Sequence, residues 1–224
     1  MTSSIETFNR ALSRIGIDQF MADPLESSKE GDLYRTWFDV CVERLLTDFP
    51  WNFATRITAL AELATDLTPG WQKKYAYPVD CLMVRQIVDA SGARSAITGY
   101  YGAWGYGWDD YCGWVRRQVP FEIMNDRESD TKVSKVIVCD MPEAYCLHVV
   151  SVTDLNLFDP LALSALEWLI ASEIAAPFHG MPTGINTAQA AGQQYRAALN
   201  AAHVRSANES GSDYRPESPA LSCR

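Results

Sequence analysis

The stretch that decides the fold is SSKEGDLYRTWFDVCVERLLTDFPWNFA, residues 27–54. Ser27 and Glu30 have the spacing of a capping box, which predicts that a helix begins there. Apolar residues then recur at three- and four-residue steps, as on the buried face of an amphipathic helix. This expected core stripe consists of Leu33, Trp37, Val40, Cys41 and Leu45. Pro50 ends the helix, because proline lacks an N–H and pushes the preceding residue out of the α region.

Three further helices are predicted around this one. Ser3 and Glu6 again have capping-box spacing, and Gly16 marks the end of a short helix over residues 3–15. Near the other end of the sequence, Asp159 is a good N-cap before Pro160, and the apolar period then continues to Pro177. A fourth, alanine-rich helix is predicted from Thr183, with Tyr195, Leu199 and Ala202 on its buried side.

Between these helices the sequence loses its helical period and becomes rich in β-formers punctuated by Gly, Pro and Asp. Strands are predicted at 75–78, 83–88, 114–119, 132–139 and 145–152, whereas 55–67 could be a strand or a short helix. The expected fold class is therefore α+β: helices that enclose a small antiparallel β domain. The expected parts are residues 1–54 and 154–205 for the helices, 55–153 for the β-rich insertion and 206–224 for a polar tail.

The composition is that of an ordinary globular protein, with 224 residues, 47% hydrophobic and 21% charged. The formal charge of −9 disfavours a protein that binds DNA by neutralising phosphates. The first residues lack the basic and apolar regions of a signal peptide and no apolar run suggests a membrane span, so we expect a cytoplasmic chain. In that compartment, its six irregularly spaced cysteines are expected to be free thiols.

No motif in the sequence indicates catalysis, a metal site or a cofactor. The three histidines, His148, His179 and His203, are far apart in the sequence and none has ligand spacing to a second donor. The carboxylates within residues 122–130 are expected to lie in a solvated loop between two strands. Walker, GxGxxG and GxSxG sequences are absent from the chain. We therefore expect a non-enzymatic protein, although an enzyme of unknown chemistry remains a weaker alternative.

The least ordinary stretch is GYYGAWGYGWDDYCGW, residues 99–114, with seven aromatics, five glycines and no basic residue. Three interpretations stay open: a contact with a partner or second subunit, the core of a local hairpin, and a carbohydrate-binding platform. Stacking on nucleic-acid bases is disfavoured, because such platforms normally line a positive groove. The candidate contact residues here are Tyr101, Trp104, Tyr106, Trp108 and Tyr111.

The order of these segments resembles a known family. ALSRIG (11–16) closes the first helix, FPWNFA (49–54) ends the long one, and YAYPVDCL (75–82), FDP (158–160) and YRAAL (195–199) follow. Over roughly residues 5–205 the chain is similar to the head-to-tail adaptor proteins of short-tailed bacteriophages, also called tail tubular protein A or podophage connector proteins. These motifs are packing patterns and carry no catalytic fingerprint. The aromatic stretch has no counterpart in the family pattern.

The resemblance implies a connector-type antiparallel helical bundle that carries a β-rich portion and an extended C-terminal tail. It implies a structural virion protein, made in the bacterial cytoplasm, that forms a ring of copies, a dodecamer, under the portal protein. The ring would receive the tail nozzle or tail tube and pass double-stranded DNA through its lumen without sequence-specific binding, with no membrane partner. The tail would dock along the portal, which makes Tyr214, Arg215 and Leu221 further contact candidates. A carbohydrate-binding or cell-wall-acting tail protein that uses residues 99–114 is the alternative.

Overall fold

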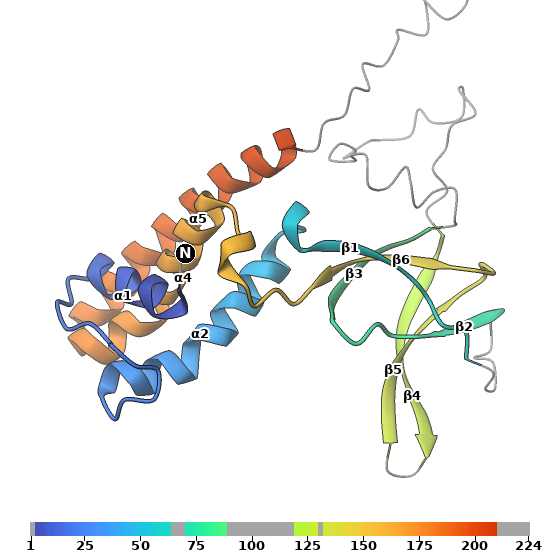
Figure 1. The fold of residues 1–224 in the computed structure, drawn as a ribbon, viewed down its shortest axis with the longest axis horizontal. Helices are drawn as coiled ribbons and strands as arrows, with labels where there is room; N and C mark the ends of the chain where they lie inside the picture. The colour runs from blue at the N-terminus through green and yellow to red at the C-terminus, as the bar shows by residue number, and fades with distance from the viewer. Residues whose placement is uncertain (1–2, 64–69, 89–118, 130–131, 210–224) are drawn as a thin grey trace, which may run out of the picture. The chain divides into compact units, whose positions relative to one another are not determined.

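The computed structural model describes residues 3–63, 70–88, 119–129 and 132–209. In this part of the chain it shows a mixed α+β protein with four α-helices and two small antiparallel sheets (Figure 1). Two compact units are present. A helical unit comprises residues 1–55 and 149–206, from both ends of the sequence, and a β unit is built on residues 56–148. The fold class predicted from the sequence is confirmed at this level. A connector-type bundle is a finer description that stays a prediction.

The helices are α1 (Ser4–Arg14), α2 (Lys29–Asp48), α4 (Pro160–His179) and α5 (Thr183–Glu209), with short 3-10 turns at Asn52–Ala54 and Leu155–Leu157. The predicted start of α1 is confirmed, because the Ser3 hydroxyl accepts a hydrogen bond from the Glu6 N–H at 3.1 Å. The start of α4 is confirmed in the same way, since Asp159 Oδ1 accepts from the Leu161 N–H at 2.7 Å. The cap of α2 was predicted one residue early: Ser28, not Ser27, accepts from the Gly31 N–H.

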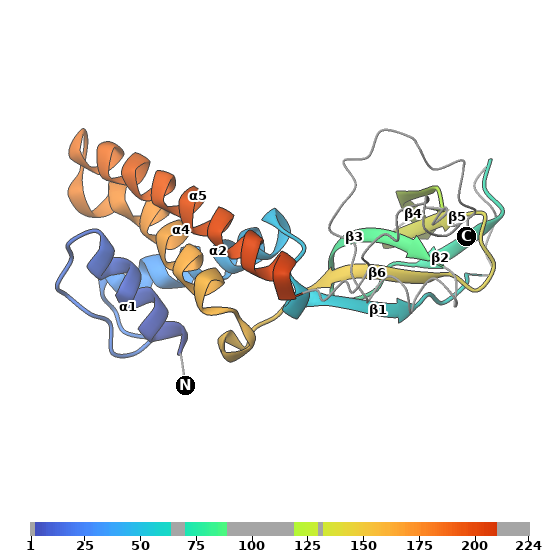
Figure 2. The same cartoon turned by 90° about the horizontal axis from the view of Figure 1, so that it is seen from above.

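Helix α4 forms the centre of the helical unit. Most of its alanines, leucines and isoleucines are almost fully buried, and both α1 and α2 pack against it. The two views agree that α5 runs along another side of α4 (Figure 2). Of the described helices, α4 is also the one long and apolar enough to cross a membrane by length and composition, and half of it is buried in the protein. Burial between three other helices accounts for its apolar sequence.

Helix α2 confirms only part of the predicted stripe: Cys41 and Leu45 are buried as expected, and Val40 is not. The buried residues are Phe38, Cys41, Val42, Leu45 and Leu46, whereas Val40 is 53% exposed. The predicted stripe also included Leu33 and Trp37, which are only half-buried. The predicted and the observed buried faces therefore overlap only in part. After the helix, Trp51 is fully buried and its Nε1–H donates to the Leu45 carbonyl at 2.8 Å. This contact turns the chain back onto α2.

Helix α4 extends two residues past the predicted end at Pro177. A proline removes only its own N–H, and the residues after it can still donate. The Gly180 N–H closes the helix on the Ala176 carbonyl at 3.1 Å, with Gly180 at φ 65°. Helix α5 then begins at Thr183, as predicted; Tyr195 and Ala202 are buried and Leu199 is half-buried.

The β unit holds most of two three-stranded sheets. The first has the order β1 (Thr55–Ala59), β6 (Tyr145–Val150), β3 (Cys81–Val88), and the second has the order β2 (Lys73–Ala76), β5 (Lys132–Cys139), β4 (Phe121–Ser129). In the second sheet β5 pairs antiparallel with both neighbours, with Tyr75 opposite Ile137 and Ile137 opposite Ile123. Their shared core includes Tyr75, Ile87, Ile137, Cys139 and Cys146. The segment 55–67, undecided from the sequence, begins as strand β1.

The prediction of a loop before strand β5 was wrong. Residues 122–130 were expected to form a solvated loop, but Glu122, Asp126 and Glu128 belong to a nine-residue strand. One of these acids is not free: the Lys74 ammonium, almost fully buried, lies 2.7 Å from an oxygen of Asp126. The strand predicted at 114–119 lies almost wholly outside the described residues.

Candidate functional site

The contact residues proposed from the sequence all lie outside the described residues. They are Tyr101, Trp104, Tyr106, Trp108 and Tyr111 in the Gly/aromatic stretch, and Tyr214, Arg215 and Leu221 in the tail. They stay predictions.

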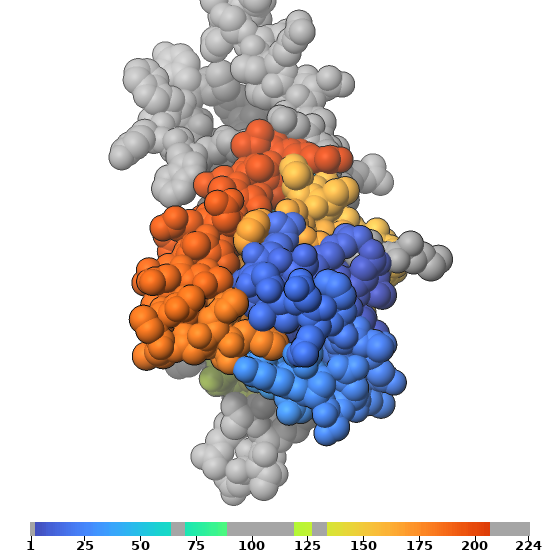
Figure 3. All heavy atoms as spheres, turned by 90° about the vertical axis from the view of Figure 1, so that its left-hand side faces the viewer, coloured from blue at the N-terminus to red at the C-terminus, as the bar shows by residue number. Residues whose placement is uncertain are grey.

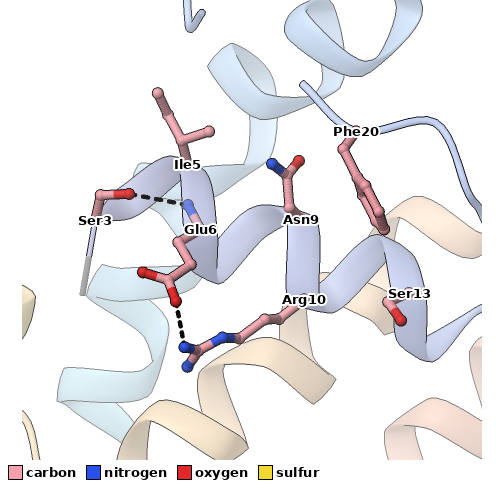
Figure 4. A pocket seen from close by; sticks show the side chains of 7 residues that line it. All are labelled: Ser3, Ile5, Glu6, Asn9, Arg10, Ser13 and Phe20. Carbon is pink, nitrogen blue, oxygen red and sulfur yellow. Dashed lines mark hydrogen bonds and ion pairs between the residues drawn. The ribbon is translucent and has the colours of Figure 1, made fainter. Parts of the chain in front are cut away.

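One open hollow lies on the outer face of α1 (Figure 4). Its volume is about 390 Å³. The residues that line it come from α1 and from the loop that follows: Ser3, Ile5, Glu6, Asn9, Arg10, Ser13 and Phe20. Sequence reasoning missed it because the Phe20 loop carries no motif.

The loop beside the hollow is held by a pair of hydrogen bonds from Asn9. Its Nδ2 donates to the Met21 carbonyl and its Oδ1 accepts from the Met21 N–H, both at 2.9 Å. Because Met21 is fixed and buried, the preceding Phe20 stays beside α1 with 60% of its surface exposed. Figure 4 shows the Phe20 ring lying against the end of α1 near Ser13. The hollow thus presents one aromatic face at a polar helix surface.

The charged groups of the hollow are engaged with α4. Arg10 forms an ion pair with Glu6 one turn earlier and lies 3.5 Å from Glu167. On the next turn, Arg14 Nε donates to the same Glu167 carboxylate at 3.0 Å, and its guanidinium lies 4.4 Å from the centre of the Trp168 ring. The side chain of Glu167 is only 7% exposed, so it is a buried carboxylate with two cationic neighbours. This network fastens α1 to α4.

The chemistry of the hollow fits a contact surface. Its only acid and base are paired with each other, and its hydroxyls have no adjacent histidine or lysine to activate them. Nor do the residues that the structure describes bring together three His, Cys, Asp or Glu side chains in a geometry for metal binding. A shallow surface with an exposed aromatic is typical of a protein–protein contact.

The cysteines of the described ranges are free, and burial makes them unreactive. Burial raises the pKa of Cys41 to about 12 and that of Cys146 to about 12, and it also raises the pKa values of Cys81 and Cys139. Thiolate nucleophiles need the opposite shift. These side chains are therefore packing residues.

The three histidines are also engaged in packing, and the structure does not bring them together. His203 stacks on Phe49 with ring centres 3.9 Å apart, and burial lowers its pKa. His179 Nε2 lies 2.9 Å from the Ile15 carbonyl oxygen. The ring of His148 is fully buried in β6, and its Nδ1 lies 3.2 Å from the Cys146 carbonyl. None of them faces the hollow.

The outer faces of α2 and α5 form two further surfaces. On the side of the helical unit seen in Figure 3, the N-terminal helices and the C-terminal helices occupy different flanks. Val40 on α2 and Val204 on α5 are 53% and 64% exposed, respectively.

Comparison of the sequence with protein-family models gave no match, and no curated protein sequence matched it.

Proposed function

We propose that this chain is a structural protein of a bacteriophage virion, a head-to-tail adaptor whose copies form a ring under the portal. In this role it extends the DNA channel and offers the attachment surface for the tail nozzle. The proposal starts from the order of packing motifs along the sequence, from ALSRIG at residue 11 to YRAAL at residue 195.

The observation that carries the proposal is the way the chain is divided. Helices from the two ends of the sequence pack on one another around α4, and the middle of the sequence forms a separate β unit. A helical bundle that carries an inserted β-rich portion is the arrangement that the resemblance implies. The same arrangement serves other functions on other proteins, so the support comes from the combination of architecture and motif order.

The described surface supports a contact role. The hollow on α1 has an exposed aromatic and no activated nucleophile. The acidic surface fits a channel protein, because like charge keeps DNA from adhering to a wall that it must slide past.

The test is native mass spectrometry of the full-length protein alone and mixed with the portal protein of the same phage. We expect copies of 25.0 kDa to add to the portal ring as a dodecamer. A variant that lacks residues 210–224 is expected to keep its far-UV circular dichroism spectrum and to lose portal binding. If the full-length protein does not associate with the portal at low or moderate salt, the adaptor proposal is wrong.

The carbohydrate-binding alternative makes a different prediction. It requires binding of the full-length protein to cell-wall or capsular glycans, with loss of binding in Trp104→Ala or Trp108→Ala. Binding to the portal without binding to any glycan on an array would exclude this alternative.

A further inference from the structure

The outer face of α5 differs from the rest of this acidic protein. One side of the helix exposes Ile185, Asn186, Gln189, Gln193, Arg196, Ala197, Asn200 and Val204. Thr183, Ala190, Gln194, Ala201 and Arg205 are exposed beside it, and Arg205 is paired with Asp159. The face contains no acid and one arginine, in a chain whose formal charge is −9. Among the described residues Arg196 makes no ion pair. We call this surface the α5 face.

The outer face of α2 has the opposite character. On one side of the helix the exposed residues are Asp32, Thr36, Asp39, Val40, Glu43 and Thr47, flanked by the exposed Arg35, Arg44 and Asp48. Arg44 is paired with Glu173 of α4. Asp32 is paired with Arg35, whereas Asp39 and Glu43 make no ion pair with any described residue. Two carboxylates four residues apart repel each other on a helix, and here Val40 stands exposed between them. We call this surface the α2 face.

We infer that the α5 face of one copy of this chain packs on the α2 face of a second copy, with Arg196 between Asp39 and Glu43 of its neighbour. Charge complementarity selects this occupant. Two copies with a formal charge of −9 each repel over most of their surface, and the α5 face is where an acidic neighbour meets a cation and no acid.

The two faces also determine the symmetry of the contact. A symmetric pairing of two α5 faces would bring the Arg196 side chains of the two copies close together. A symmetric pairing of two α2 faces would bring four unpaired carboxylates together, Asp39 and Glu43 from each copy. A contact between unlike faces avoids both repulsions. It leaves each copy with one free face of each kind, so that further copies add in the same way, as in a ring, where the rotation between neighbours closes. The inference rests on the proposed ring and names the surfaces that would build it.

The apolar residues support a packed contact. Val40 on the α2 face and Val204 on the α5 face are exposed. The alanine and glutamine residues of the α5 face allow close approach of a second helix. Burying the valines against the neighbouring copy would add apolar contact to the ion pair, which alone would be weak at a surface.

The test is a charge-reversal cycle in the full-length protein: Glu43→Arg, Arg196→Glu, and the two together. Assembly is measured by sedimentation velocity and native mass spectrometry, for the protein alone and on the portal ring. Each single reversal is expected to weaken self-association at least tenfold, and the double variant is expected to recover most of it. Glu122→Arg, at an exposed position on strand β4, makes the same charge change as Glu43→Arg and should leave assembly unchanged. Circular dichroism checks that every variant is folded.

The outcomes separate this inference from the proposed function. If the wild type forms rings and the single reversals assemble equally well, the inference fails and the adaptor proposal stands. The same holds if both single variants lose assembly and the double variant does not regain it, because the two charges then do not meet. A wild-type protein that stays monomeric both alone and with the portal overturns the inference and the proposed function together.

Discussion

Helix α5 packs very closely on α4 at Gly184, the second residue of α5. A Cβ built there would lie 2.7 Å from the Cα of Ala176 and 3.1 and 3.2 Å from the carbonyl oxygens of Ala176 and Ala175. All three neighbours are backbone atoms of α4, so they cannot move away as a flexible side chain could. We therefore expect Gly184→Ala to force α5 away from the end of α4.

The size of the effect follows from two opposing terms. Overpacking against an unyielding neighbour costs about 1–3 kcal/mol. Replacing glycine by alanine in a helix recovers up to about 1 kcal/mol, and less at the second residue than in the interior. The net loss for Gly184→Ala is about 1–2 kcal/mol, which corresponds to a melting temperature about 2–8 °C lower for a protein of this size.

Gly192 provides the matched control on the same helix. It is in the interior of α5, and a Cβ there would meet no atom within 4 Å. Gly192→Ala should therefore raise the stability of the helical unit by about 0.5–1 kcal/mol. Both variants are compared with the wild type by urea and thermal unfolding, followed by far-UV circular dichroism, because the helices belong to one of two compact units. If Gly184→Ala is as stable as Gly192→Ala, the close packing of α5 on α4 is wrong.

Three other measurements test the helical unit and its core. Burial lowers the pKa of His203 below its ordinary 6.5, so the unfolded chain takes up the proton at a higher pH than the folded protein does. The free energy of unfolding should therefore fall as the pH drops below about 6.5. Urea unfolding at several pH values should show a weaker pH dependence for His203→Phe. Arg14→Ala leaves the buried Glu167 carboxylate with only Arg10 nearby and should cost about 1–3 kcal/mol, whereas Arg14→Ala combined with Glu167→Gln should recover part of that loss. Cys41 and Cys146, with pKa values near 12, should resist a thiol reagent at pH 8 in the folded protein and react on unfolding; rapid native labelling would contradict their burial.

The parts of the fold that could be predicted from the sequence are those fixed by local chemistry. The Ser3 and Asp159 caps, the break at Pro50 and the start of α5 at Thr183 each depend on a few neighbouring residues, and the structure has them as expected. The cap of α2 shows the limit of this reasoning. Ser27 and Ser28 are chemically identical, and only the position of the helix against its neighbours selects Ser28.

The failures arose where burial depends on partners far away in the sequence. Strand β4 carries acids at Glu122, Asp126 and Glu128, which read as a loop when the strand is considered alone. This segment is a strand because it pairs with β5 and because the Lys74 ammonium lies beside Asp126. Neither contact can be predicted from the local sequence. The prediction that Val40 is buried was wrong for a related reason. Helices α4 and α1 both contact α2 and decide which side of it is buried, and they come from opposite ends of the sequence.

The surface candidates follow the same division. The Gly/aromatic stretch at 99–114 was found by composition and lies outside the described residues, whereas the hollow on α1 has no composition signal. It exists because Asn9 holds the Met21 backbone and so keeps Phe20 exposed beside α1. A single asparagine twelve positions away fixes this loop, and nothing in the neighbouring letters distinguishes it from any other surface asparagine.

The burial of α4 limits where a neighbouring copy can bind the helical unit. Helix α4 is the most apolar helix described, and in an isolated sequence it would be the first choice for a contact surface or a membrane span. Most of its alanine, leucine and isoleucine side chains are already buried, with α1 and α2 packed against it and α5 running along another side (Figure 2). A partner must therefore use the outer faces of the covering helices, whose exposed residues are mainly polar and charged. On such faces charge complementarity decides which surfaces meet, and this is why single charge reversals at Arg196 and Glu43 can test the contact without disturbing the core.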